Sequence, residues 1–351
     1  MATGLPLTAL LGQVCIALTV EADNEFEHRL GSYFTTDFRT SGGGGGPWLI
    51  STHCYINFLR LVPDDGIRAG ELAQMSGDDR PAPRLFDGLR RWGYCTYTPD
   101  IVGTSPKKSD ADAIVRCTPN GTRARATWEE IFDHLVTRWS RRGLDPLRAA
   151  LVTVVASLDR PLPEYLPLVE APDRRMSVPV RPTSRPADEL HVLSLIAQLL
   201  TALTLDFELK SSHSLATCAS LIRPLSSDPV LVRELPGLTG VALKDWDAGV
   251  NQLARAGLIE VTKRTEKPTG KAIRLTDRGL RLQFDYPTLL ADVEGPWEEI
   301  CRGVRSELEA LVDDALSWTA PYTDNWRAQR PMAALAHQPI VTHRGGYPDG
   351  S

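Results

Sequence analysis

Val115–Arg123 reads VRCTPNGTR, and Ile273–Arg281 reads IRLTDRGLR. The two stretches correspond position by position, and the spacing then continues without a gap to Trp139 and Trp297. Both begin with the alternation of apolar and polar residues that is typical of a strand. A correspondence between such distant parts of one chain indicates an internal repeat.

Three earlier pairs of segments match in the same order. The matched pairs are Ala9–Leu30 with Ser194–Leu215, Asn57–Gly77 with Ser220–Gly240, and LRRWGY around Leu89 and Gly93 with LARAGL around Leu253 and Gly257. The first pair is apolar at helical spacing in both copies, and acidic residues follow at the same place. Any two amphipathic helices look somewhat alike, but four collinear matches favour one domain written twice.

Composition predicts where the two copies begin and end. We expect the first repeat at residues 1–157, a linker at 158–189, the second repeat at 190–318 and a poorly ordered tail at 319–351. The linker holds seven prolines with Ser, Arg and Asp between them, which predicts an extended chain with little capacity to pack. The pentaglycine Gly42–Gly46 is a flexible insertion of the first copy alone.

Bulk composition describes an ordinary globular protein. Of the 351 residues, 42% are hydrophobic and 24% are charged, and the net charge is -5. This mild acidity argues against non-specific coating of polyanions, so any contact with nucleic acid requires a local cluster of basic residues.

The cysteines and the N-terminal segment bear on the compartment. Six scattered cysteines without a CxxC pair indicate reduced thiols, with redox sensing by one of them as an alternative. The apolar N-terminus lacks a basic segment and runs directly into acidic residues, which argues against a targeting signal. No stretch is expected to span a bilayer, so we expect a cytoplasmic protein without membrane contact.

Each copy predicts the same order of elements: helix, helix, short helix, turn, helix, hairpin, and closing helices. In the first copy the short helix is expected at Gly70–Met75, the next helix at Arg84–Trp92, and a closing helix from Thr127. In the second copy the closing helices are expected from Pro287 to Trp318. A helix-turn-helix followed by a two-stranded wing is a winged helix. The predicted fold is therefore mainly α with small β-wings, two winged helix-turn-helix domains packed as a pseudo-dimer through long helices.

The stretches GIRAGELAQMSG, LRRWGY and VRCTPNGTR, with their counterparts in the second copy, resemble the MarR family of bacterial regulators. In that family a helix-turn-helix leads to a wing that ends in a Leu-Thr-x-x-Gly segment. The resemblance covers nearly the whole chain except the linker and the tail. It implies that the long first helices and the closing helices dimerise. Because the unit is duplicated, a monomeric pseudo-dimer is expected.

The resemblance also implies contact with double-stranded DNA through the recognition helices and wings. The candidate DNA-binding residues are Arg80, Arg84, Arg90, Arg91, Lys107, Lys108, Lys244, Asn251, Lys263, Arg264, Lys267 and Lys271. The chain departs from the family pattern, because the first wing lacks the arginine of the usual Asp-x-Arg and the second recognition helix carries Asp245 and Asp247. Because the two recognition helices and wings differ, a symmetric, palindromic DNA target is not expected. Arg and Lys are also common on protein surfaces that bind nothing.

A small organic effector, aromatic or amphipathic, is the further partner that the resemblance implies, in the crevice between the dimerisation helices and the winged-helix domain. The candidate pocket residues are Phe26, His28, Trp48, His53, Tyr55, Phe207 and His213. Ordinary core packing is the alternative for each aromatic residue. No hydrolase, zinc-protease or phosphate-loop signature occurs, so no enzyme activity, metal or cofactor is expected.

Two functions remain open at this point. The first is a ligand-responsive transcription regulator that binds DNA. The second is a winged-helix protein that does not bind DNA and serves small-molecule sequestration or protein–protein contact. The positions of the recognition helices and the charge around them discriminate between the two.

Overall fold

The structure, a computed structural model, describes residues 4–29, 52–75, 89–90, 93–99, 111–166, 183–235, 238 and 243–318. Over these ranges the protein is mainly helical with two small antiparallel sheets, which confirms the predicted class at that level. The pentaglycine, the tail and most of the helix expected at Arg84–Trp92 lie outside the described residues.

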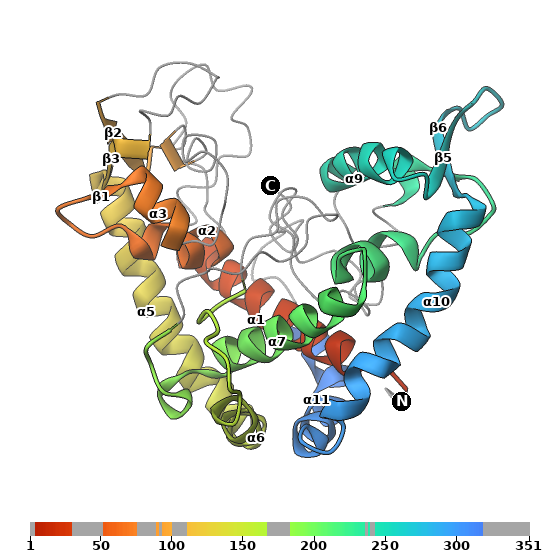
Figure 1. The fold of residues 1–351 in the computed structure, drawn as a ribbon. Coiled ribbons are helices and arrows are strands. Elements are labelled where there is room, and N and C mark those ends of the chain that lie inside the picture. Colours follow the sequence, from red (N-terminus) through yellow and green to blue (C-terminus); the bar gives the residue numbers. More distant parts are fainter. Residues whose placement is uncertain are drawn as a thin grey trace.

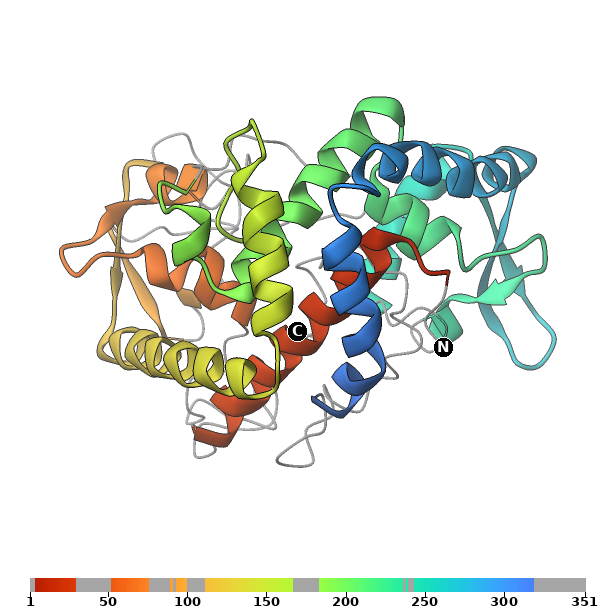
Figure 2. The same ribbon diagram turned by 90° about the horizontal axis from the view of Figure 1, so that it is seen from below.

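Four helices meet at the centre of the molecule (Figures 1 and 2). They are α1 (Leu7–Arg29), α6 (Asp145–Ala156), α7 (Val192–Lys210) and α11 (Arg302–Trp318). Helix α1 contacts α7 and α11, and α6 also contacts both α7 and α11. Seen from below, α6 and α11 run beside each other across α1 (Figure 2). One continuous core cluster therefore includes residues from both halves of the chain.

Helix α7 is an exception to the expectation that no segment is long and apolar enough to span a bilayer. Its 19 residues have a mean hydropathy of 1.6 over the most apolar window, and 83% of that window is buried inside the protein. A helix that is apolar around its whole circumference is buried either in lipid or in a protein core. Here the surrounding helices provide that core.

Each end of the molecule carries a three-stranded antiparallel sheet (Figure 1). The first comprises β1 (Ile67–Arg68), β2 (Cys95–Thr98) and β3 (Ile114–Cys117) in the order β1-β3-β2. The second comprises β4 (Val230–Leu231), β5 (Ile259–Arg264) and β6 (Gly270–Leu275) in the order β4-β6-β5. The last strand is central in both sheets. Sequence analysis predicted only the two hairpin strands of each, because β1 and β4 are too short to show a pattern.

The helices at the two ends correspond only in part over the described residues, since most of the segment that corresponds to α9 in the first half lies outside them. The first half has α2 (Thr52–Asn57), η2 (Leu59–Leu61), α3 (Ala69–Met75) and α5 (Pro119–Arg141). The second half has the π-helical η5 (Thr217–Ile222), η6 (Val232–Glu234), α9 (Leu243–Arg255), α10 (Asp277–Glu294) and η7 (Gly295–Trp297). One more short turn, η4 (Ala187–Glu189), precedes α7.

The closing helices begin earlier than predicted. Helix α5 begins at Pro119 rather than Thr127, and α10 begins at Asp277 and contains Pro287 in its interior. A proline in the first turn of a helix removes an N–H that has no intrahelical partner, so Pro119 suits the start of α5.

The repeated Thr-x-x-Gly segments build the same junction between sheet and helix in both halves. Thr118 caps α5 by accepting a hydrogen bond from Gly121 N at 3.1 Å, and its hydroxyl donates to Gly93 O at 2.6 Å. Thr276 caps α10 through Gly279 N at 3.2 Å and donates to Gly257 O at 2.7 Å. The glycine in the first turn is needed for space. A Cβ at Gly121 would lie 2.0 Å from Tyr94 O, and one at Gly279 would lie 2.1 Å from Leu258 O.

A second repeated contact fastens each closing helix to a central helix. The indole N–H of Trp139 donates to Glu21 Oε2 on α1 at 2.8 Å. The indole N–H of Trp297 donates to Asp206 Oδ2 on α7 at 3.0 Å. The two tryptophans correspond in the sequence repeat, as do the two acids. The bond of Trp139 therefore links α5 to α1, and the bond of Trp297 links η7, which directly follows α10, to α7.

We predict that Gly121→Ala and Gly279→Ala each destabilise the protein by roughly 1–3 kcal/mol, because the added methyl group overlaps a backbone oxygen. Urea unfolding followed by circular dichroism measures the change. Gly295→Ala is the control, since a Cβ there meets no atom within 4 Å. If the three variants unfold at the same urea concentration, the junction is not as tight as described.

Candidate functional site

The β5–β6 hairpin is the most exposed cluster of predicted DNA-binding residues. Figure 1 shows it projecting beyond the other elements at its end of the molecule. The side chains of Lys263, Arg264, Lys267 and Lys271 are all exposed. The register places Lys263 directly opposite Lys271. Like charges directly opposite each other destabilise a strand pair, so this arrangement favours a bound anion.

The base of the same hairpin differs from its tip in charge, because it contains an ion pair. Arg274 donates to Glu260 Oε2 from both Nε and Nη2, at 2.8 and 2.6 Å. The base is therefore neutralised within the hairpin. At the tip, no ion pair within 4 Å joins any of the four basic side chains to an acid in the described parts of the chain. Glu266 is the one acidic residue among residues 263–271, so the tip keeps a net positive charge.

Helix α9 packs beside the hairpin against β5. Trp246, Val250 and Leu253 hold one face of α9 in the core of this end of the molecule, and Trp246 is completely buried. Asn251 and Arg255 lie on the exposed face. Lys244 belongs to the first turn of α9, but its side chain is not among those described. The hairpin and the open face of α9 together form the candidate nucleic-acid surface.

The corresponding surface of the first half is described only in part. Arg90 is half-buried in the short helical segment that precedes Gly93. The other predicted residues of this surface, Arg80, Arg84, Arg91, Lys107 and Lys108, lie outside the described residues.

The predicted pocket aromatics that the structure describes are core residues. Phe26 and Tyr55 are buried and stack on Trp128, with ring centroids 4.4 and 5.4 Å away. Phe207 is fully buried and meets Tyr286 edge-on at 5.9 Å. These three rings fill space between helices and do not line the cavities described below. Their burial is the core packing that the sequence analysis kept as the alternative for each aromatic residue, because an aromatic residue in a core and one in a pocket have the same sequence pattern.

The predicted histidines contribute less to a site. His213 is half-buried, and its pKa is lowered by loss of solvent and by the nearby Arg278. The side chains of His28 and His53 are not among those described, and Trp48 lies outside the described residues.

A cavity of about 220 Å³ lies between the first half and the linker. Asn57, Arg60 and Met75 line it from the helices of the first half, and Glu164 and Arg185 line it from the linker. A second cavity of about 20 Å³, near Cys15 and Leu193, shares Asn57 and Tyr165 with the lining of the first and has room for about one water molecule.

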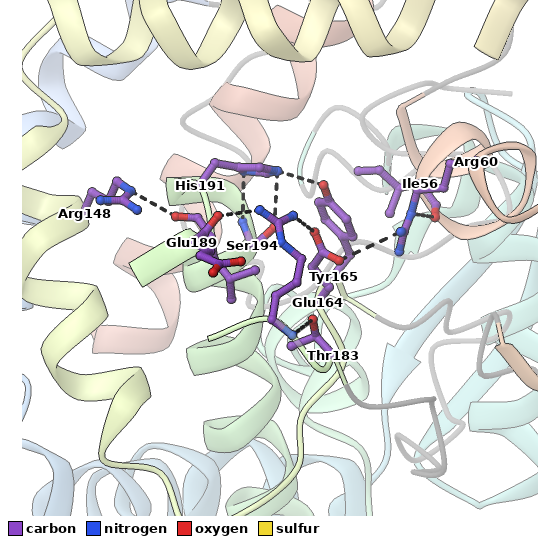
Figure 3. Close-up of polar contacts among 11 residues, drawn as sticks. Ile56, Arg60, Arg148, Glu164, Tyr165, Thr183, Glu189, His191 and Ser194 are labelled. Atoms are coloured by element: carbon purple, nitrogen blue, oxygen red, sulfur yellow. Dashed lines mark hydrogen bonds and ion pairs between the residues drawn. The ribbon is translucent and has the colours of Figure 1, made fainter. Parts of the chain in front are cut away.

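A polar network closes the cavity on the linker side (Figure 3). Glu164 lies 3.1 Å from Arg185 Nη1 and 3.9 Å from Arg60 Nη1. The Arg60 guanidinium also lies 4.8 Å from the centre of the Tyr165 ring. Two guanidinium groups thus share one carboxylate, which leaves the cavity wall with an excess of positive charge.

The network continues from Tyr165 to the start of α7. The Tyr165 hydroxyl lies 2.7 Å from His191 Nε2, and the Ser194 amide donates to His191 Nδ1 at 3.4 Å. With Nδ1 as an acceptor, the ring proton lies on Nε2 and points to Tyr165. Burial, with the nearby arginines, lowers the pKa of His191 to about 3, and burial raises the pKa of Tyr165 to about 12. Both side chains are therefore neutral at physiological pH.

The described parts of the linker pack firmly, contrary to the prediction of an extended segment with little capacity to pack. Leu162 and Leu166 are buried in the central core cluster. Thr183 N donates to Leu162 O at 3.0 Å, and Arg160 reaches Asp206 on α7 at 2.9 Å. Proline keeps the chain extended without preventing the apolar side chains between the prolines from packing. The alternation in PLPEYLPL was the available signal.

Comparison with protein-family models, with curated proteins and with solved structures gave no match.

We predict that the buried imidazole makes the protein less stable in mild acid. The unfolded chain binds a proton at His191 below about pH 6.5, whereas the folded chain does not until about pH 3. The stability present above pH 6.5 is therefore lost as the pH falls toward 3, by roughly 1–2 kcal/mol between pH 7 and 5. Urea unfolding at several pH values measures this slope.

His191→Gln is expected to remove the contribution of His191 to the pH dependence of the unfolding free energy. His134→Gln is the control because His134 is exposed. An unchanged slope in His191→Gln would exclude the buried imidazole as its source.

Proposed function

We propose that this chain is a transcription regulator of the winged helix-turn-helix class, similar to the MarR family, which binds double-stranded DNA. The observation that carries the proposal is the concentration of unneutralised positive charge on the β5–β6 hairpin, directly beside the open face of α9. In an overall acidic chain, such a local cluster is the electrostatic signature of a nucleic-acid contact.

In this proposal α9 is the recognition helix and the hairpin is the wing. Trp246 anchors one face of α9, so the opposite face with Asn251 and Arg255 is available to the major groove. Lys263 and Lys271 contact a backbone phosphate, which relieves their mutual repulsion. Phosphate contacts set affinity and register, and α9 supplies the contacts to bases.

The repeated element order supports a single-chain pseudo-dimer. Helix α1 of the first half contacts α11 of the second half, and α7 of the second half contacts α6 of the first half. Reciprocal contacts of this kind are the property of a two-fold interface between like subunits. In this proposal one chain carries two DNA-binding surfaces, one at each end of the molecule, where the two sheets lie (Figure 1).

The cavity beside the linker is the proposed effector site. It lies between the helices of the first half and the linker, where a ligand is able to alter how these two parts sit relative to each other. The ring of Tyr165 and the guanidinium groups of Arg60 and Arg185 suit a small aromatic compound with an anionic group. The same cavity is the specific support for the alternative function, small-molecule sequestration without DNA binding.

We predict that Lys263→Ala/Lys271→Ala weakens binding to a DNA fragment from the promoter region of the chain's own gene. If each lysine contacts one phosphate, the slope of log K against log salt becomes less negative by roughly 0.9 per lysine. Fluorescence anisotropy at several salt concentrations measures both the affinity and the slope.

The matched control is Arg141→Ala/Arg302→Ala, which removes the same charge from exposed positions on α5 and α11. An equal effect of the two double variants would show that only net charge matters and would remove the hairpin as the contact. Absence of DNA binding together with stabilisation by small aromatic acids would favour the alternative function.

A further inference from the structure

Two cysteines face each other across the first sheet. Cys95 on β2 is the direct partner of Cys117 on β3. The neighbouring pair is hydrogen-bonded, since Thr118 N donates to Tyr94 O at 2.9 Å, so Cys95 and Cys117 form a non-hydrogen-bonded pair. The Cα atoms of such pairs are about 4.5 Å apart, within the range of about 4.4–6.8 Å that a disulfide requires. Residues directly opposite each other in an antiparallel pair have their side chains on the same face of the sheet, so the two thiols are neighbours.

The environments of the two thiols differ. Cys95 is buried, whereas Cys117 is half-buried and directly precedes Thr118, the cap of α5. The pKa of Cys117 is lowered, mainly by the hydrogen bond from Cys95 and further by Arg125, although burial and Asp64 oppose the shift. The pKa of Cys95 is raised by its bond to Cys117 and by burial. Because Cys117 is the more exposed of the two thiols, a dissolved disulfide reaches it first, so Cys117 is the nucleophile of the pair and Cys95 is placed to resolve a bond formed on it.

The second half of the chain provides a comparison at the same positions. Ile259 and Leu275 are direct partners across β5 and β6, and both are buried. Two apolar side chains are therefore sufficient for packing at this point of the sheet. The first half has two thiols there. Two facing thiols are able to form a disulfide, whereas isoleucine and leucine are not.

The remaining cysteines lack these properties. Cys15, Cys54, Cys218 and Cys301 are all buried. Burial raises the pKa to about 12 for Cys15 and Cys218 and to about 11 for Cys301. A thiol that stays protonated and shielded reacts slowly with disulfides, so these residues are internal controls.

We propose that Cys95 and Cys117 are a reversible redox modification site that a low-molecular-weight disulfide of the glutathione type oxidises. The thiolate of Cys117 attacks one sulfur of the small disulfide, whose S–S bond breaks and releases one small thiol after it takes up a proton. Cys95 then loses its proton and attacks Cys117 Sγ, which releases the second small thiol. Two protein thiols are oxidised to one disulfide, and one small disulfide is reduced to two thiols.

The site is independent of the proposed DNA contact. It lies in the sheet at the opposite end of the molecule from the β5–β6 hairpin (Figure 1). Its disulfide would join β2 and β3 next to the junction of Gly93, Thr118 and Gly121. The chemistry is therefore testable whether or not the chain binds DNA.

The test uses the full chain, folded, with oxidised glutathione at neutral pH. Mass spectrometry of the intact protein and of its peptides is expected to show loss of two hydrogens and a Cys95–Cys117 link. In Cys95→Ser the reaction is expected to stop at one glutathione on Cys117. In Cys117→Ser the rate is expected to fall at least about tenfold, because the remaining thiols are buried.

Two further variants test specificity. Cys301→Ser is expected to react like the wild type. The double variant Cys95→Ile/Cys117→Leu carries the pair found in the second half, and it is expected to fold and to lose the reaction. Three outcomes would each overturn the proposal. The first is glutathione attached initially to a cysteine other than Cys117, and the second is equal reaction rates for Cys95→Ser and Cys117→Ser. The third is a glutathione adduct on Cys117 of the wild type that never converts to the disulfide.

Discussion

In each half of this protein, a hydrogen bond from a tryptophan indole to an acid on a central helix fixes how the half is assembled. Glu21 is buried on α1, and a lone carboxylate in that position would be strongly unfavourable. Trp139 donates to it at 2.8 Å, and Arg138 and Arg142 lie 3.2 and 2.8 Å away. Hydrogen bonds to a charged group contribute about 1.5–3 kcal/mol each, so this contact orients α5 on α1 as well as stabilising it. Trp297 and Asp206 repeat the contact in the second half.

The rest of each half follows from that contact. Because α5 and α10 begin at the Thr-x-x-Gly junctions, fixing their far ends against α1 and α7 also fixes the position of each sheet. The sheets thus lie at opposite ends of the molecule, with the four central helices between them (Figure 1). The proposed recognition surface depends on this placement, although none of its residues takes part in the contact.

The two halves differ where function is proposed. The linker packs beside the first half, where Glu164 lies between Arg60 and Arg185 and Tyr165 meets His191. The second half carries the basic hairpin, and the first half carries the paired thiols. A duplicated chain is free to change one copy without changing the other, which a homodimer cannot do. Ligand sensing, DNA contact and thiol chemistry are therefore proposed for different parts of one chain.

Periodicity and repetition were sufficient to predict a mainly helical chain with a small hairpin in each half, because an amphipathic pattern and a capping threonine act over a few residues. They also predicted the basic hairpin, since charge on a short loop remains exposed in almost any fold. They failed for β1 and β4, which are two residues each, and for the starts of α5 and α10, which begin at Pro119 and Asp277 rather than at Thr127 and Pro287. They left open whether Phe26 and Tyr55 are pocket or core residues, and in the structure both rings are buried and stack on Trp128.

By itself, the amino-acid sequence determined the repeated elements, the apolar central helices and the location of exposed positive charge. Only the tertiary structure decided that the proline-rich linker packs into the core, that Arg60 and Arg185 share Glu164, and that Cys95 faces Cys117. Local patterns report the interactions of residues close in sequence, whereas these contacts join residues that the folded core alone brings together.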